Sequence, residues 1–293
     1  MLAIARRRTF GFLLLGATAL CGLSAVVAMP AAGAAASDTM KGLFAHRGIY
    51  ELKLVAQKGI SDISDAEGKL VYEFTGSVCE GFSTQFRFVT RLTSTEGQVK
   101  LSDMRTSSYE DAAGDTFDFV NQTYTSSVLT EDDKGSAARD NDGVAVTVSK
   151  PAAAKLRLPG EALFPTQHLA HLVEAAKAGK TVTEIVLYDG TDAGAKVYRT
   201  TSVIGKELPL DEDLAEEKAA DVPALAKIRR WPVTISYFNY PKTGEQAGAT
   251  PDYSLTFVLY ENGVSRSMKL DYGDFVLSGK LVDFKPIEQK PCP

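Results

Sequence analysis

The chain has 293 residues, with 32 basic against 37 acidic side chains and a formal net charge of −5 at pH 7. An acidic chain without basic clusters is poorly suited to nucleic acid, because that binding depends on neutralising phosphates. The length suits one large β domain or two small ones, and no segment after the N-terminal one approaches membrane-spanning length.

The first 36 residues have the three-part layout of a secretory signal peptide. Three arginines at 6–8 precede an apolar run at 10–27, and small residues then offer Ala-x-Ala cleavage sites after Ala34 or Ala36. A transmembrane anchor is the alternative, but glycines within the run and the small-residue exit favour cleavage. We predict export to the periplasm by the general secretory or the twin-arginine route, and no membrane span after cleavage.

Two of the three cysteines remain in the predicted mature domain, residues 37–293. Cys21 lies in the apolar run behind Leu20, where a bacterial lipoprotein signal would carry a small residue, so we expect its removal. Cys79 and Cys292 have no base or metal ligand nearby in sequence, and an even pair in an exported protein is most simply a disulfide. Two unpaired thiols are the alternative. The bond would close a loop of about 214 residues, for which chain entropy predicts about 5 kcal/mol of stabilisation.

Alternating apolar and polar residues predict strands along most of the mature chain. Within 49–56, every second residue from Tyr50 to Ala56 is apolar, which defines a buried face. The pair Asn262 and Gly263 suits the positive φ angles of a tight hairpin turn. Further strand patterns cover 85–92, 116–124, 143–150, 253–270 and 271–284.

One segment, 166–178, instead has helical spacing, with Thr166 as the expected N-cap and Gln167 facing outward. A second, weaker helical pattern covers 211–230. Many strands and one central helix favour a single large antiparallel sheet, curved into an open barrel around that helix. The helix would either fill the concave face or close one end and leave a pocket. Its apolar stripe, predicted to pack in the concavity, is Leu169, Leu172, Val173 and Ala176.

No catalytic, metal or cofactor motif is evident in the sequence. His168 and His171 lie one helix turn apart, but neither they nor His46 have a third metal ligand nearby. The acidic turn at 139–143 lacks the glycine and closing glutamate of a calcium loop. The tripeptide that begins at Asn121 matches a glycosylation acceptor, a pattern frequent by chance. With no G-x-S-x-G elbow and no glycine-rich phosphate loop either, we predict a protein that is not an enzyme and binds no metal or cofactor.

Five stretches of the mature chain together point to a known family. They are AHRGIYEL at 45–52, YEFTGSVCEGF at 72–82, LFPTQH at 163–168, VTISYF at 233–238, and DYGDFVLSGKLVDF at 271–284 followed by Cys292. In content and order they resemble the bacterial cell-envelope integrity protein EipB family. The resemblance implies a periplasmic, spiral-like broken β-barrel that contributes to envelope integrity. It also implies that the family's two cysteines correspond to Cys79 and Cys292.

Three classes of function follow. The resemblance favours a non-catalytic protein that supports the envelope through partner interaction, for which a periplasmic helical-repeat (TPR) protein is a candidate partner. The sheet-around-helix shape is similar to that of periplasmic lipoprotein carriers, so a carrier that binds a lipid or an acylated ligand in its concave face is the alternative. An enzyme with a site assembled from distant residues is kept as a check, because a fold alone does not determine function.

Overall fold

The computed structural model contains one antiparallel sheet of fourteen strands among the residues that it describes. Those residues are 39–58, 61–210, 217, 222–240, 250–290 and 292. The predicted signal peptide lies outside them, as does the first half of the weaker helical pattern apart from Glu217. The second half of that pattern forms a turn over 223–227 rather than a helix, a correction that is consistent with Pro223 at its start. Within the described part, no helix has the length and apolar character needed to cross a membrane.

The strands are neighbours in chain order with one exception. From one edge the sheet runs from β8 back to β1, and then continues from β14 back to β9. The β1–β14 pair therefore joins the two halves, while β8 and β9 remain as edges that α2 (Pro165–Lys177) connects. The strands are β1 (His46–Gln57), β2 (Ile63–Ser77), β3 (Gly81–Ser94), β4 (Val99–Glu110), β5 (Thr116–Thr125), β6 (Val128–Asp140), β7 (Gly143–Lys150), β8 (Ala154–Leu158), β9 (Val182–Leu187), β10 (Tyr198–Ile204), β11 (Arg230–Asn239), β12 (Tyr253–Tyr260), β13 (Ser265–Asp271) and β14 (Phe275–Pro286).

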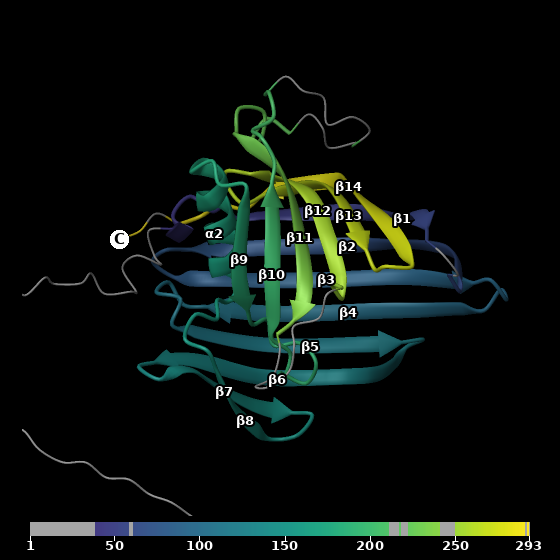
Figure 1. Ribbon diagram of the computed structural model, residues 1–293, viewed down its shortest axis with the longest axis horizontal. Helices are drawn as coiled ribbons and strands as arrows, with labels where there is room; N and C mark the ends of the chain where they lie inside the picture. Colours follow the sequence, from purple (N-terminus) through teal and green to yellow (C-terminus); the bar gives the residue numbers. More distant parts are fainter. Residues whose placement is uncertain are drawn as a thin grey trace, which may run out of the picture. The chain divides into compact units, whose positions relative to one another are not determined.

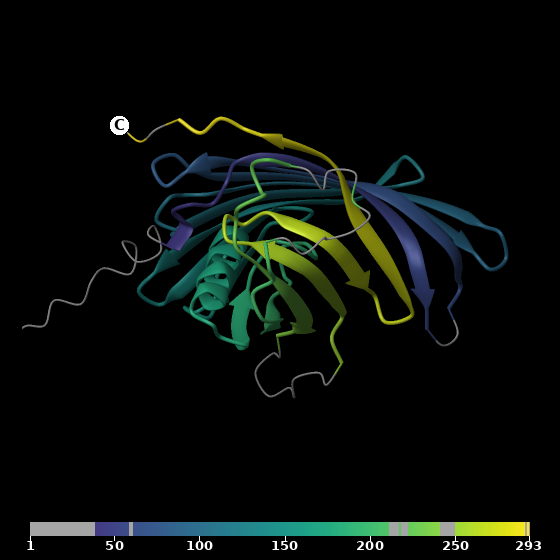
Figure 2. The same cartoon turned by 90° about the horizontal axis from the view of Figure 1, so that it is seen from above.

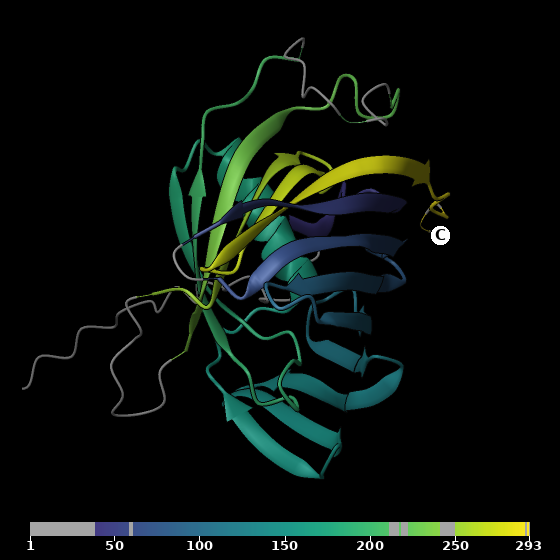
Figure 3. The same cartoon turned by 90° about the vertical axis from the view of Figure 1, so that its right-hand side faces the viewer.

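The sheet curves so far that its two halves face each other. Strands β2 to β6 run across the view in Figure 1, and β9 to β13 cross in front of them at a steep angle. Figures 2 and 3 show α2 in the space between these two parts. Near the edges, Leu163 N donates to Val186 O at 2.8 Å and Tyr188 N donates to Leu163 O at 2.9 Å. The predicted fold, an antiparallel sheet curved into a broken barrel around one helix, is confirmed.

The alternation in β1 shows how sequence sets the inner face. Tyr50 and Leu52 are almost fully buried, as predicted, but Ala56 at the end of the strand is exposed. Register shifts against β14 occur after Ile49 and after Leu54, and such bulges bend a strand and turn its later residues away from the core. The predicted hairpin is also present, since Gly263 has φ +84° between β12 and β13.

The apolar stripe of α2 packs against the inner side of the sheet. Leu172, Val173 and Ala176 are buried in the main hydrophobic core, and Leu169 is partly buried against it. The same core contains Trp231 of β11. Fully burying a leucine or valine side chain contributes about 1.5–3 kcal/mol, so this contact holds the helix between the two halves.

The start of α2 differs from the prediction in two respects. Its N-cap is Phe164, so Thr166 lies inside the first turn instead of capping it. Gln167 is buried rather than outward, because its Oε1 accepts the N–H of Phe164 at 3.1 Å. The side chain that sequence placed in solvent is therefore part of the cap.

Candidate functional site

The two halves of the sheet enclose a cavity of about 710 Å³. Its walls come from β1 to β6 on one side and β9 to β13 on the other, while Leu169 and Leu172 of α2 also line it. The helix therefore does not fill the concavity, and a pocket remains beside it. The volume lies within the range of roughly 300–1,000 Å³ that is typical of small-molecule sites.

A row of aromatic rings from successive strands forms one wall of the cavity. Tyr198, Tyr237, Tyr253 and Tyr272 all line it, and Phe275 extends the row. The Tyr237 and Tyr253 centroids are 4.3 Å apart, and these residues are direct partners in the β11–β12 register. Burial raises the pKa of Tyr272 to about 12 and raises that of Tyr237 further, so both hydroxyls stay protonated at neutral pH.

Beside this row lies a polar end of the cavity, built largely by the loop after β9. Asp189 Oδ1 accepts the N–H of Thr191 at 3.1 Å and its hydroxyl at 2.7 Å. Burial raises the pKa of Asp189. Lys196 also lines this end, and its Nζ lies 2.7 Å from Asp252 Oδ2. This end is thus acidic overall, whereas most of the cavity wall is apolar or aromatic.

The three histidines lie in different surroundings. His46 is buried among aromatic rings and donates from Nδ1 to Phe44 O at 2.6 Å. His168 is buried with Nε2 3.2 Å from the Thr200 hydroxyl, and burial lowers its pKa to about 4. His171, one helix turn further along, is exposed, and its Nε2 lies 3.5 Å from the Thr183 hydroxyl. Across the described residues, no group of three or more His, Cys, Asp or Glu side chains could hold a metal ion.

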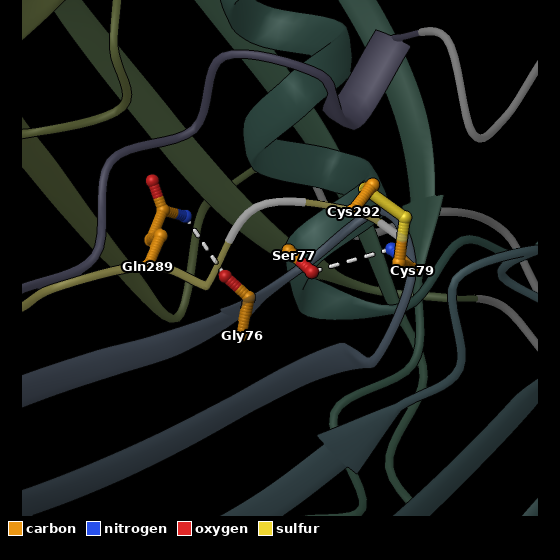
Figure 4. The surroundings of a disulfide bond; sticks show 5 residues. All are labelled: Gly76, Ser77, Cys79, Gln289 and Cys292. Carbon is orange, nitrogen blue, oxygen red and sulfur yellow. Dashed lines mark hydrogen bonds between the residues drawn. A yellow bond between two sulfur atoms is a disulfide. The ribbon is translucent and has the colours of Figure 1, made fainter.

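The two predicted cysteines are joined. Cys79, in the turn between β2 and β3, forms a disulfide with Cys292 with a Cα–Cα distance of 5.7 Å (Figure 4). Gln289 Nε2 donates to Gly76 O at 2.8 Å and to Leu43 O at 3.2 Å, so the tail is also held by hydrogen bonds. The alternative of two unpaired thiols is wrong.

A buried carboxylate, which the sequence pattern did not single out, lies at the start of α2. Glu110, the last residue of β4, is 2% exposed. It accepts the N–H of Thr166 at 2.5 Å and of Gln167 at 3.3 Å. Burial raises its pKa to about 7, although these two N–H bonds act in the opposite direction. No local pattern could reveal this contact, because its partners are more than 50 residues away in sequence.

The raised pKa of Glu110 predicts that the stability of the protein falls as the pH rises. In the folded chain Glu110 keeps its proton up to about pH 7, whereas in the unfolded chain it loses it near pH 4.5. Between these two pH values the folded chain keeps a proton that the unfolded chain has released. The free energy of unfolding therefore falls by about 3 kcal/mol across this range. We expect the stability of the wild type relative to Glu110→Gln to fall by that amount from pH 4.5 to 7.5 in urea titrations. A difference independent of pH would contradict this.

The chain is similar to proteins of known family. A family model described as EipB-like matches residues 37–288. The curated "Cell envelope integrity protein EipB" of Brucella abortus (strain 2308) is 39% identical over 251 residues, which cover 86% of this chain and 87% of that protein. A crystal structure from Brucella abortus, described as a beta-barrel-like protein of a domain of unknown function, superposes with a TM-score of 0.76 at 36% identity. The superposition covers 84% of this chain and 99% of the Brucella chain.

Proposed function

Because the chain belongs to the EipB-like family, we propose that it is a non-catalytic periplasmic protein that supports cell-envelope integrity. The name of the Brucella relative supports the envelope role, and the secretory layout of residues 1–36 supports the compartment. His46 and His168 make core contacts and Glu110 receives N–H groups at the start of α2, which gives no support to proton-transfer chemistry by these residues.

The geometry supports ligand binding as the way in which the protein acts. The observation that carries this proposal is the largely apolar cavity of about 710 Å³ that α2 leaves open. A scaffold that acts by its outer surface alone has no use for such a space, and empty apolar volume is costly for a folded protein. We assign it to a lipid or an acylated ligand, including the acyl group of a lipoprotein.

Interaction with a protein partner, such as a periplasmic TPR protein, is the second candidate. Its support is an exposed apolar area at one end of the sheet. Val99 and Leu101 of β4 are 48% and 47% exposed, and Val128 of β6 is 65% exposed. Ser126 N donates to Leu101 O at 2.9 Å, which brings the β5–β6 turn beside β4. Apolar side chains gathered in this way are typical of contact surfaces.

Ligand retention tests the carrier function. We expect a native mass spectrum of protein from fractionated periplasm to contain an extra mass of lipid size, lost on denaturation. Leu255→Trp places a larger side chain in the cavity, so the spectrum of this variant should lack the extra mass. Val203→Trp, at an exposed position on β10, should still show it. The same spectra report the N-terminus, expected near Ala35 or Ser37. Ligand-free wild type that still complements a deletion strain would favour the partner candidate.

The non-catalytic part of the proposal has its own test. We expect the double variant His46→Asn, His168→Gln to complement a deletion strain under detergent stress as well as wild type does. Each new amide can donate the hydrogen bond made by the original ring nitrogen, to Phe44 O and the Thr200 hydroxyl, but cannot transfer a proton at neutral pH. A variant with native melting and wild-type ligand retention that fails to complement would contradict the non-catalytic function.

A further inference from the structure

The polar end of the cavity contains a buried acceptor that no described residue meets with a hydrogen bond. Asn121 of β5 is 8% exposed and lines the cavity. Its Nδ2 donates to Gly190 O at 2.9 Å, which fixes the orientation of the amide, because Oδ1 in that place would face another acceptor. Oδ1 is buried and has no hydrogen-bond partner among the described residues. Such an atom is costly unless a ligand donor meets it.

Two carboxylates lie next to this amide. Asp133 of β6 is the direct register partner of Asn121, and Asp189 immediately precedes Gly190. Both line the cavity. Asp133 Oδ2 accepts the N–H of Ala193 at 2.9 Å, so the loop after β9 holds the two strands and the carboxylates together. The three side chains together offer carboxylate and amide oxygens to anything that enters this end.

Little positive charge opposes them. Among the described residues that line the cavity, Lys196 is the one lysine or arginine, and it forms an ion pair with Asp252. The two histidines of the lining, His46 and His168, are buried, and burial lowers the pKa of both, which keeps them neutral at pH 7. The titratable groups at this end are therefore mainly acidic. Burial raises the pKa of Asp133 and of Asp189, and a cation beside them favours their charged forms.

The tyrosine row begins beside these acceptors. Burial and then the nearby Asp189 carboxylate raise the pKa of Tyr198, to about 12, and of Tyr237. These two rings meet edge to face with centroids 5.6 Å apart. The faces of aromatic rings attract cations. Lys196 Nζ already lies 5.1 Å from the Tyr198 ring centroid, which shows that a cation fits beside this ring. The carboxylates, the unpartnered amide oxygen and the ring of Tyr198 thus favour the same kind of group.

We infer that this end of the cavity binds a primary ammonium group carried on an apolar chain. An ammonium brings three donors and a positive charge, which matches an acceptor-only surface of Asn121, Asp133 and Asp189. A metal ion is a poorer match, because the described residues contain no suitable cluster of ligands. The apolar remainder of the cavity takes the chain. This assignment rests on the proposed ligand-binding function and names the head group of the ligand.

Calorimetry with amphiphiles of one chain length separates the two proposals. We expect dodecylammonium, below its micellar concentration at pH 7, to bind delipidated wild type about tenfold to a hundredfold tighter than dodecanol. Dodecyltrimethylammonium should bind more weakly than dodecylammonium, because it has no N–H to donate to the acceptors at this end. Equal affinities for dodecylammonium and dodecanol would overturn the ammonium assignment and leave the carrier function intact. Absence of binding by all three would overturn both.

A variant locates the head group. Asp189→Asn keeps an acceptor for the Thr191 N–H and hydroxyl but removes the charge, and should weaken dodecylammonium about tenfold or more while leaving dodecanol unchanged. Asp111→Asn is the matched control, because Asp111 accepts two backbone N–H groups in a turn outside the cavity lining. Equal loss in both variants, or no loss in Asp189→Asn with a native melting curve, would overturn the assignment. The comparison of amphiphiles on wild type needs no variant.

Discussion

Replacing Cys79 and Cys292 together by serine is expected to lower the free energy of unfolding by about 2–5 kcal/mol. The bond joins residues 213 apart in sequence, so its loss frees a very long loop in the unfolded chain. The folded chain changes less, because Gln289 still holds the tail through its bonds to Leu43 and Gly76. For a domain of this size the expected fall in melting temperature is roughly 10 °C.

Calorimetric melting of oxidised wild type, reduced wild type and the double variant measures this effect. Reduced wild type should melt with the double variant, because both lack the same cross-link. A double variant that melts together with oxidised wild type would show that the bond adds nothing to stability. Ligand binding should survive at temperatures where the variant is folded, since neither cysteine lines the cavity.

Leu172→Asp is expected to have the larger effect on function. Leu172 is 1% exposed and lies between the core and the cavity, so the change removes apolar contacts and buries a carboxylate. A leucine lost from a core costs about 2–5 kcal/mol by itself, and an unpaired buried charge adds to this. The sum approaches the total stability of an ordinary domain. We expect little folded protein and no complementation of a deletion strain.

His171→Asp is the matched control for that change. It introduces the same carboxylate one residue earlier in α2, at an exposed position. Surface substitutions usually change stability by less than about 0.5 kcal/mol, so this variant should melt and complement like wild type. If Leu172→Asp instead folds and complements, the helix stripe is not needed for the core, and the packing account is wrong.

The sequence was most informative where its signals are local. Period-two alternation identified the inner face at Tyr50 and Leu52 because a strand shows its side chains on opposite faces in turn. Helical spacing identified the apolar stripe of α2 because residues three and four apart lie on the same face of a helix. The prediction for Ala56 was wrong because a bulge depends on the register with β14, which the sequence of one strand does not contain.

The candidate site is a different case. Asn121, Asp133 and Asp189 come from two strands and a loop, and the spacing of Asp189 from the other two is more than 50 residues. In sequence Asn121 was distinguished by a chance glycosylation match, whereas in the fold it is buried against Gly190. Glu110 likewise gained its role from contact with the start of α2. Side chains acquire such environments when distant strands meet, and no local periodicity encodes that meeting.

By itself the sequence determined the class of the fold, most of the inner face of β1 and the approximate position of the helix, and it favoured the pairing of Cys79 with Cys292, because periodicity and cysteine count are properties of the chain alone. The tertiary structure decided whether the concave face was filled. Leu169 and Leu172 were compatible with either outcome, since an apolar stripe must be buried in both. The curvature of the sheet, which sets the distance between its halves, left a cavity of about 710 Å³ beside the helix.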